Sequence, residues 1–139
     1  MLSDVAVAVK KVAYYTGGPA GSWLFYNPPP IPSDLTQMND GKGYWMESAA
    51  GPLTVCGYEH CAPLPAAPPY YDVVEAWNMI GFKSTTAKQA EKYLKAIKEN
   101  VMVIYGFKDG VYFLVLAGGD LEPGLGYWIA LTAPGTIYP

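Results

Sequence analysis

The chain has 139 residues and a formal net charge of −3 at pH 7, and all nine of its basic residues are lysines. Because arginine is the usual bidentate partner of phosphate and guanine, its absence from an acidic chain argues against a nucleic-acid partner. No apolar run is long enough to cross a bilayer as a helix, so we expect no membrane span in this chain. The 15 glycines, 13 prolines and many aromatic residues favour short strands joined by tight turns over a helical bundle.

The N-terminal stretch has two interpretations. Apolar residues within 3–11 recur at helical spacing and Ser3 is an N-cap candidate, whereas Val5–Val9 alternates as in a strand. We expect a short helix, because a clearer helix occupies the matching place in the second half of the chain. Strands are predicted over 12–15 and Trp23–Tyr26, separated by a glycine-rich loop.

Proline and glycine divide the next part of the chain. The segment Asn27–Pro32 has few backbone donors for a β-ladder, so we expect an extended segment at the rim. A turn at Gly41–Gly43 then leads into a strand at Tyr44–Met46, and a short strand is predicted over Leu53–Val55. The prolines within 59–74 predict a stiff connector.

The second half opens with a strand over Ala76–Phe82. Thr86 and Gln89 then match a capping box, and the following pattern predicts a helix that ends near Glu99. The apolar face of this helix is expected to contain Ala90, Leu94, Ile97 and Val101.

Strands follow to the end of the chain. Asp109-Gly110 is a strong hairpin signal between strands predicted over 101–107 and 111–116. A final short strand is predicted at Thr136-Ile137.

A six-residue pattern occurs twice. Gly41–Met46 and Gly124–Ile129 both have the form Gly-x-Gly-Tyr-Trp-apolar, and similar elements surround each copy in the same order. Internal duplication of this kind indicates two related units. We predict an α+β, β-dominated fold of two pseudo-repeat units, each built of short antiparallel strands and one short helix. Residues 1–58 and 75–139 are the predicted units, and 59–74 connect them.

Three segments carry a resemblance to a known repeat. Trp77–Gly81 resembles the Gly-Trp-Asn-Leu-Ile-Gly opening of a repeat module in surface and secreted proteins of archaea and bacteria. Leu121–Ile129 is similar to its Leu-x-Pro-Gly-x-Gly-Tyr-Trp-Ile strand without a gap, and Met38–Met46 is similar with Asp40 in place of proline. The resemblance implies an extracellular, non-catalytic module with no functional residues to transfer. The repeat signature, taken as structural, comprises Gly41, Gly43, Tyr44, Trp45, Trp77, Asn78, Gly81, Gly124, Gly126, Tyr127 and Trp128.

The first unit departs from this pattern. It has no counterpart of Trp77–Gly81 before Ser3, so it lacks an opening strand. A missing strand leaves a sheet edge that invites pairing with another chain. We therefore expect a structural or interaction module of an extracellular or cell-surface protein. Its partners would be other protein chains, including copies of itself in an oligomer or filament.

The aromatic residues support an alternative function. We expect Trp45 and Trp128 to share a core role, because they occupy equivalent places and large aromatic side chains dominate cores. Strand alternation directs other rings outward, so Trp23, Tyr26 and Tyr112 are candidates for stacking on a carbohydrate. A glycan is thus the alternative partner.

Motifs for catalysis are weak. The paired glycines precede a strand-like segment rather than a helix, so they are interpreted as backbone turn residues, with positive φ or at a bulge, and not as a phosphate loop. No serine lies in a Gly-x-Ser-x-Gly elbow, and the acidic residues form no recurring pair. We expect no enzymatic activity and no cofactor.

The segment Cys56–Cys61 has three interpretations. An extracellular location favours a disulfide between Cys56 and Cys61. The alternatives are two free thiols, or a metal site that includes His60 but lacks a clear fourth ligand and the usual cysteine spacing.

We predict that Cys56 and Cys61 are bridged. A thiol-reactive dye should then label the unfolded chain only after a reductant has been added. Labelling of both cysteines without reductant would rule the bridge out.

Overall fold

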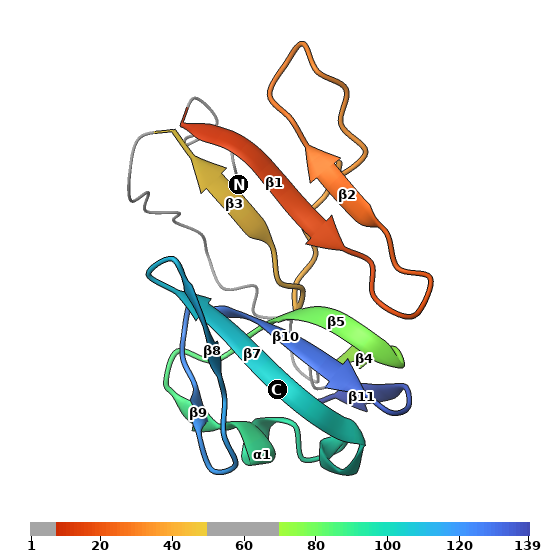
Figure 1. Cartoon of the computed structure of the whole chain (residues 1–139), viewed down its shortest axis with the longest axis vertical. Helices are drawn as coiled ribbons and strands as arrows, with labels where there is room; N and C mark the ends of the chain where they lie inside the picture. Colours follow the sequence, from red (N-terminus) through yellow and green to blue (C-terminus); the bar gives the residue numbers. More distant parts are fainter. Residues whose placement is uncertain (1–7, 50–69) are drawn as a thin grey trace, which may run out of the picture.

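The computed structural model describes residues 8–49 and 70–139, and β-strands dominate it (Figure 1). The strands are β1 (Val9–Tyr15), β2 (Trp23–Tyr26), β3 (Trp45–Ser48), β4 (Tyr71–Val73), β5 (Ala76–Gly81), β6 (Lys88–Gln89), β7 (Val101–Lys108), β8 (Val111–Leu114), β9 (Asp120–Leu121), β10 (Gly126–Leu131) and β11 (Gly135–Ile137). The helical segments are α1 (Ala90–Tyr93) and a 3₁₀ helix, η1 (Lys98–Asn100). Among these segments no helix is long and apolar enough to span a membrane.

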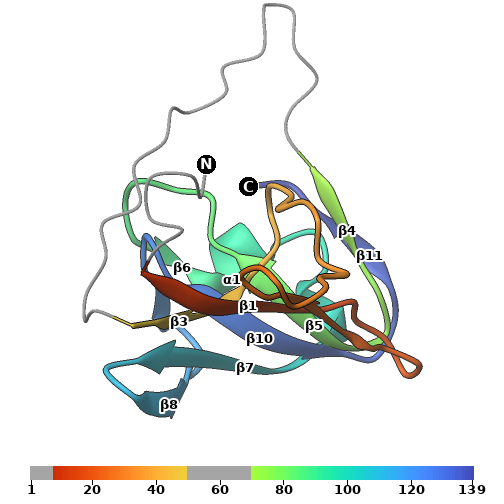
Figure 2. The same ribbon diagram turned by 90° about the horizontal axis from the view of Figure 1, so that it is seen from above.

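Two antiparallel sheets make up most of the structure. One has three strands in the order β2-β1-β3, and the other has four in the order β5-β10-β7-β8. Figures 1 and 2 show the three-stranded sheet beside the β5 edge of the four-stranded sheet. Short ladders join β4 to β11 and β6 to β9. The predicted β-dominated fold is therefore confirmed.

Several predicted elements are present. The strands predicted over Trp23–Tyr26 and Ala76–Phe82 correspond to β2 and β5. The hairpin at Asp109-Gly110 joins β7 to β8, with φ of 53° and 83° at its two central residues. Positive φ at both positions matches the type I′ turn that Asp-Gly favours.

The helix expected over 3–11 is wrong in the part that the structure describes. Val9–Lys11 belong to β1, and residues 8–49 contain no helix. The pairing of β1 with β3 shifts register between Val9 and Lys11, as at a β-bulge. This shift lets Val9 and Val12, three residues apart, both be buried. The buried residues of this strand therefore have the spacing that is typical of a helix.

The second predicted helix is much shorter than expected. Only Ala90–Tyr93 is α-helical, and Lys88-Gln89 forms β6 instead of the predicted capping box. The Thr86 N–H bonds to Ser84 Oγ, and the Ala90 N–H donates to Gly119 O at 2.9 Å. The burial pattern was nevertheless correct for three of the predicted positions, since Ala90, Leu94 and Ile97 are buried.

The main core lies on one face of the four-stranded sheet. Tyr127, Ile129 and Leu131 of the central strand β10 are buried there against α1 and the turn that follows it. β4, which falls within the predicted connector 59–74, also contributes to this core through Tyr71 and Val73. A smaller core under the three-stranded sheet contains Val9, Val12 and Leu35. Each sheet thus buries one face.

A backbone crossing joins the two sheets. Lys42, between the first pair of signature glycines, forms an antiparallel bridge with Ile80 of β5. The Gly43 N–H donates to Met79 O at 3.2 Å, and the Gly81 N–H donates to Gly41 O at 3.1 Å. β5 therefore pairs with β10 on one side and with the first signature on the other.

Glycine is required for this close approach. A Cβ at Gly43 would lie 2.7 Å from Ile80 O, and a Cβ at Gly81 would lie 2.7 Å from Lys42 O. Both obstacles are backbone atoms that cannot rotate away. Two signature glycines are thus explained by packing between backbones.

We predict that Gly43→Ala destabilises the protein by roughly 2 kcal/mol, because the new methyl group forces the crossing apart. The matched control is Gly126→Ala in the second signature, where a Cβ finds its nearest atoms at an ordinary 3.7 Å. Urea unfolding of the two variants should separate them clearly. Equal midpoints would show that the crossing does not limit stability.

Candidate binding site on the aromatic face

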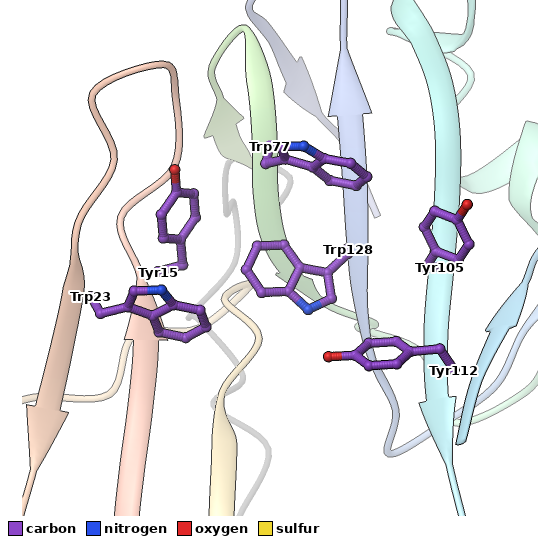
Figure 3. A pocket seen from close by; sticks show the side chains of 6 residues that line it. All are labelled: Tyr15, Trp23, Trp77, Tyr105, Tyr112 and Trp128. Atoms are coloured by element: carbon purple, nitrogen blue, oxygen red, sulfur yellow. The ribbon is translucent and has the colours of Figure 1, made fainter. Parts of the chain in front are cut away.

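The faces opposite the two cores are covered by aromatic side chains. We call this surface the aromatic face. Its members are Tyr15, Trp23, Phe25, Trp45, Trp77, Tyr105, Phe107, Tyr112 and Trp128. They come from strands of both sheets, so the surface crosses the junction between them (Figure 3).

Strand alternation places these rings together. Along β10, Tyr127 points into the core, so Trp128 points to the opposite face. Trp128 is paired with Tyr105 of β7, and directly opposite residues in a ladder share a face. The register of the sheet therefore creates the aromatic row.

The largest aromatic cluster surrounds an open cleft of about 450 Å³. The cleft is lined by Tyr15, Trp23, Trp77, Tyr105, Tyr112 and Trp128. Trp128 lies at its centre, with ring centroids 5.5 Å from Tyr15, 5.7 Å from Trp23 and 6.2 Å from Trp77. The rings meet at tilted or edge-to-face angles, which are favourable geometries for aromatic pairs.

A second cleft of about 600 Å³ adjoins the first, and Trp23 and Tyr112 line both. Its other lining residues are Lys11, Ala13, Phe25, Trp45, Met46 and Glu47. The Lys11 ammonium lies 4.0 Å from the centre of the Phe25 ring. This cleft thus combines aromatic surface with a hydrogen-bond donor and a carboxylate.

The structure brings together two of the three predicted stacking residues. Trp23 and Tyr112 share both clefts, and their side chains are 40% and 59% exposed. Tyr26 instead packs against the small core of Val9, Val12 and Leu35, on the opposite face.

Four lining residues of the first cleft were not among the predicted carbohydrate-stacking residues. These are Tyr15, Trp77, Tyr105 and Trp128. The expectation that Trp45 and Trp128 are core residues is wrong, because both are partly exposed and line clefts. The signal was available in the Tyr-Trp pair of each signature, since neighbouring strand residues point to opposite faces.

The two signatures share local geometry. Gly41 and Gly124 have φ of 76° and 79°, as predicted for turn glycines, whereas the second glycine of each pair, Gly43 or Gly126, does not have positive φ. The Asn39 N–H donates to the Tyr44 hydroxyl at 2.7 Å, and the Glu122 N–H donates to the Tyr127 hydroxyl at 2.6 Å. In each copy, a tyrosine hydroxyl therefore ties the strand to the backbone five residues earlier.

Asn78 of the repeat signature has a structural role. The Asn78 amide accepts a hydrogen bond from the Val74 N–H and donates to Val74 O and Ala76 O, which holds a turn in which Ala76 has φ of 67°. Asn78 is buried and faces away from the clefts.

Residues 8–49 and 70–139 contain no group of three or more His, Cys, Asp or Glu side chains able to hold a metal. Cys56, His60 and Cys61 lie outside these ranges, so the predicted disulfide stays a prediction.

The Tyr71 and Tyr93 hydroxyls are 3.0 Å apart, but they lie in the core. Burial and the Tyr93 hydrogen bond raise the pKa of Tyr71, so its hydroxyl stays protonated.

Comparison of the chain with protein-family models, curated proteins and solved structures found no match in any of the three. The geometry of the aromatic face is therefore the basis for the function proposed below.

We predict that the free energy of unfolding decreases above about pH 10, where unfolded tyrosines begin to ionise. Burial raises the pKa of Tyr14, Tyr44, Tyr71 and Tyr127, so the native state retains protons that the unfolded state releases. Burial lowers the pKa of Lys42. This single group therefore makes the free energy of unfolding increase with pH, in opposition to the four tyrosines. Urea midpoints measured from pH 8.5 to 11 test the trend, and Tyr127→Phe should make the decline shallower. A midpoint that rises over this range would contradict it.

Proposed function

We propose that this chain is a non-catalytic interaction module of an extracellular or cell-surface protein, and that its aromatic face binds carbohydrate. The observation that carries the proposal is the cleft lined entirely by six tryptophan and tyrosine side chains from both sheets. Binding sites for small molecules are concave and mostly apolar, with a few polar groups that fix orientation. The clefts have this composition.

Carbohydrate suits this surface for a chemical reason. A pyranose ring has an apolar C–H face that packs on an aromatic ring, while its hydroxyls need hydrogen-bond partners around the edge. Tyrosine hydroxyls and indole N–H groups supply both properties on one side chain. Trp23 and Phe25 are nearly parallel, at 15° with centroids 6.4 Å apart, and Lys11 and Glu47 line the same cleft. The Trp23 and Phe25 rings thus offer flat apolar surfaces for a sugar ring, with polar side chains beside them.

The two adjoining clefts favour an extended glycan over a single sugar. They share Trp23 and Tyr112, so a ligand in one cleft continues into the other without leaving aromatic surface. The ring of Trp45 packs 4.4 Å from Phe107 and 5.9 Å from Tyr112, which carries the surface from β3 to β7 and β8. An oligosaccharide would therefore contact both sheets.

We propose further that the two halves of the chain are duplicated copies of one β unit. Three features support it: the shared signature, the positive φ at Gly41 and Gly124, and the equivalent hydroxyl bonds of Tyr44 and Tyr127. The strand order β3-β1-β2 also parallels β10-β7-β8. β5, the opening strand of the second unit, pairs with both signatures. The resemblance to surface and secreted repeat modules is the basis for the proposed location.

We predict that the chain binds at least one class of glycan on a glycan array or in affinity gels containing soluble polysaccharides. Trp23→Ala should weaken binding on the order of tenfold, which corresponds to about 1.4 kcal/mol of lost stacking. Trp128→Ala should have a similar effect.

The matched control is Tyr138→Ala, which removes an exposed ring that lies outside both clefts. It should leave glycan affinity unchanged. Circular dichroism must show that each variant is folded. Silence across the array, or equal affinity of the Trp23 and Tyr138 variants, would refute the proposed site.

A further inference from the structure

β8 is the outer strand of the four-stranded sheet (Figure 2). Most of its residues are exposed. Val111, Tyr112 and Leu114 are 65%, 59% and 47% exposed, and Leu116 just beyond the strand is 68% exposed. No charged residue interrupts the sequence from Val111 to Leu116. Exposed apolar edge strands of this kind are templates for pairing with another strand.

The backbone of β8 has groups available for such pairing. The Val115 N–H donates to Ile104 O at 2.9 Å, so Val115 is one of the residues whose backbone groups face β7. In an antiparallel ladder, alternate residues direct both backbone groups to the same side. Tyr112 and Leu114 therefore direct their N–H and C=O groups away from β7, on a side where no described strand lies.

Two other outer strands, β5 and β2, have covered edges. The outer side of β5 is occupied by the bridge from Lys42 to Ile80. On β2, Phe25 O accepts hydrogen bonds from the N–H groups of Asp34 and Leu35 in the following loop. β8 has no equivalent cover among the described residues.

We infer that β8 pairs antiparallel with β8 of a second copy of this chain, so that two four-stranded sheets join into one. The favoured register places Tyr112 opposite Leu114 of the second copy and Phe113 opposite its own symmetry mate. Tyr112 and Leu114 then exchange both of their outward backbone hydrogen bonds, and the twofold axis repeats the pair.

The side chains favour a second copy as the occupant. In this register the apolar residues of β8 meet one another and no like charges come together. Leu116 falls opposite Gly110 of the second copy, and there is open space around Gly110, with no atom within 4 Å of a Cβ placed there. β8 therefore meets its copy as one uncharged apolar strand against another, with space for Leu116 beside Gly110.

The pairing also affects the aromatic face. Tyr112 lines both clefts, so a twofold axis at β8 brings the clefts of the two copies close to each other. Two linked sites raise the apparent affinity for a repeating ligand. The inference itself rests on the β8 edge and is independent of any glycan.

The test is sedimentation equilibrium of the full chain over a range of concentrations. We expect a reversible dimer that Leu114→Lys weakens on the order of tenfold or more, because a charge at the edge opposes strand pairing. The matched control, Ile31→Lys, places the same charge on an exposed apolar residue of a distant loop and should leave the dimer intact.

Hydrogen exchange provides a readout specific to the edge. Protection of the Tyr112 and Leu114 amides should increase with protein concentration in the wild-type chain and not in Leu114→Lys. A wild-type chain that stays monomeric at millimolar concentration would overturn the inference. So would a dimer that Leu114→Lys does not weaken, or an open-ended polymer in place of a dimer.

Discussion

The architecture depends on the backbone crossing at β5. Three glycines, Gly41, Gly43 and Gly81, allow the first signature to hydrogen-bond directly to a strand that is already paired with β10. Backbone groups so close together leave no room for a Cβ at Gly43 or Gly81. The two sheets are therefore held by directional hydrogen bonds at short range, which fix their relative position more strictly than side-chain packing alone.

The crossing has a direct consequence for the surface. With the two sheets placed side by side, each buries one face in its own core, and both remaining faces lie on the same side of the molecule. Contacts such as Tyr15 with Trp128 and Trp45 with Phe107 then form across the junction. The clefts exist only because strands from both sheets contribute rings to one surface. Ring packing and backbone crossing support each other.

The agreement between the predicted and the observed elements varies along the chain. The hairpin at Asp109-Gly110 was predictable because two adjacent residues determine its φ angles. The helix expected over 3–11 is wrong over the described residues 8–11, because a register shift in β1 lets Val9 and Val12 both be buried at helical spacing. Of the proposed stacking residues, Trp23 and Tyr112 reached the clefts, whereas Tyr26 faces the small core. Alternation along a strand indicates that neighbours face opposite sides without identifying the buried side.

The sequence by itself determined the β-dominated class, the turns that need glycine, and the burial of Ala90, Leu94 and Ile97. These follow from steric and apolar preferences that act over a few residues. Only the tertiary structure decided that Tyr127 enters the core while Trp128 faces a cleft, and that rings distant in sequence share it. The physical reason is that the buried face of a strand is the one against which another layer packs. That layer comes from elsewhere in the chain, so local preferences do not specify it.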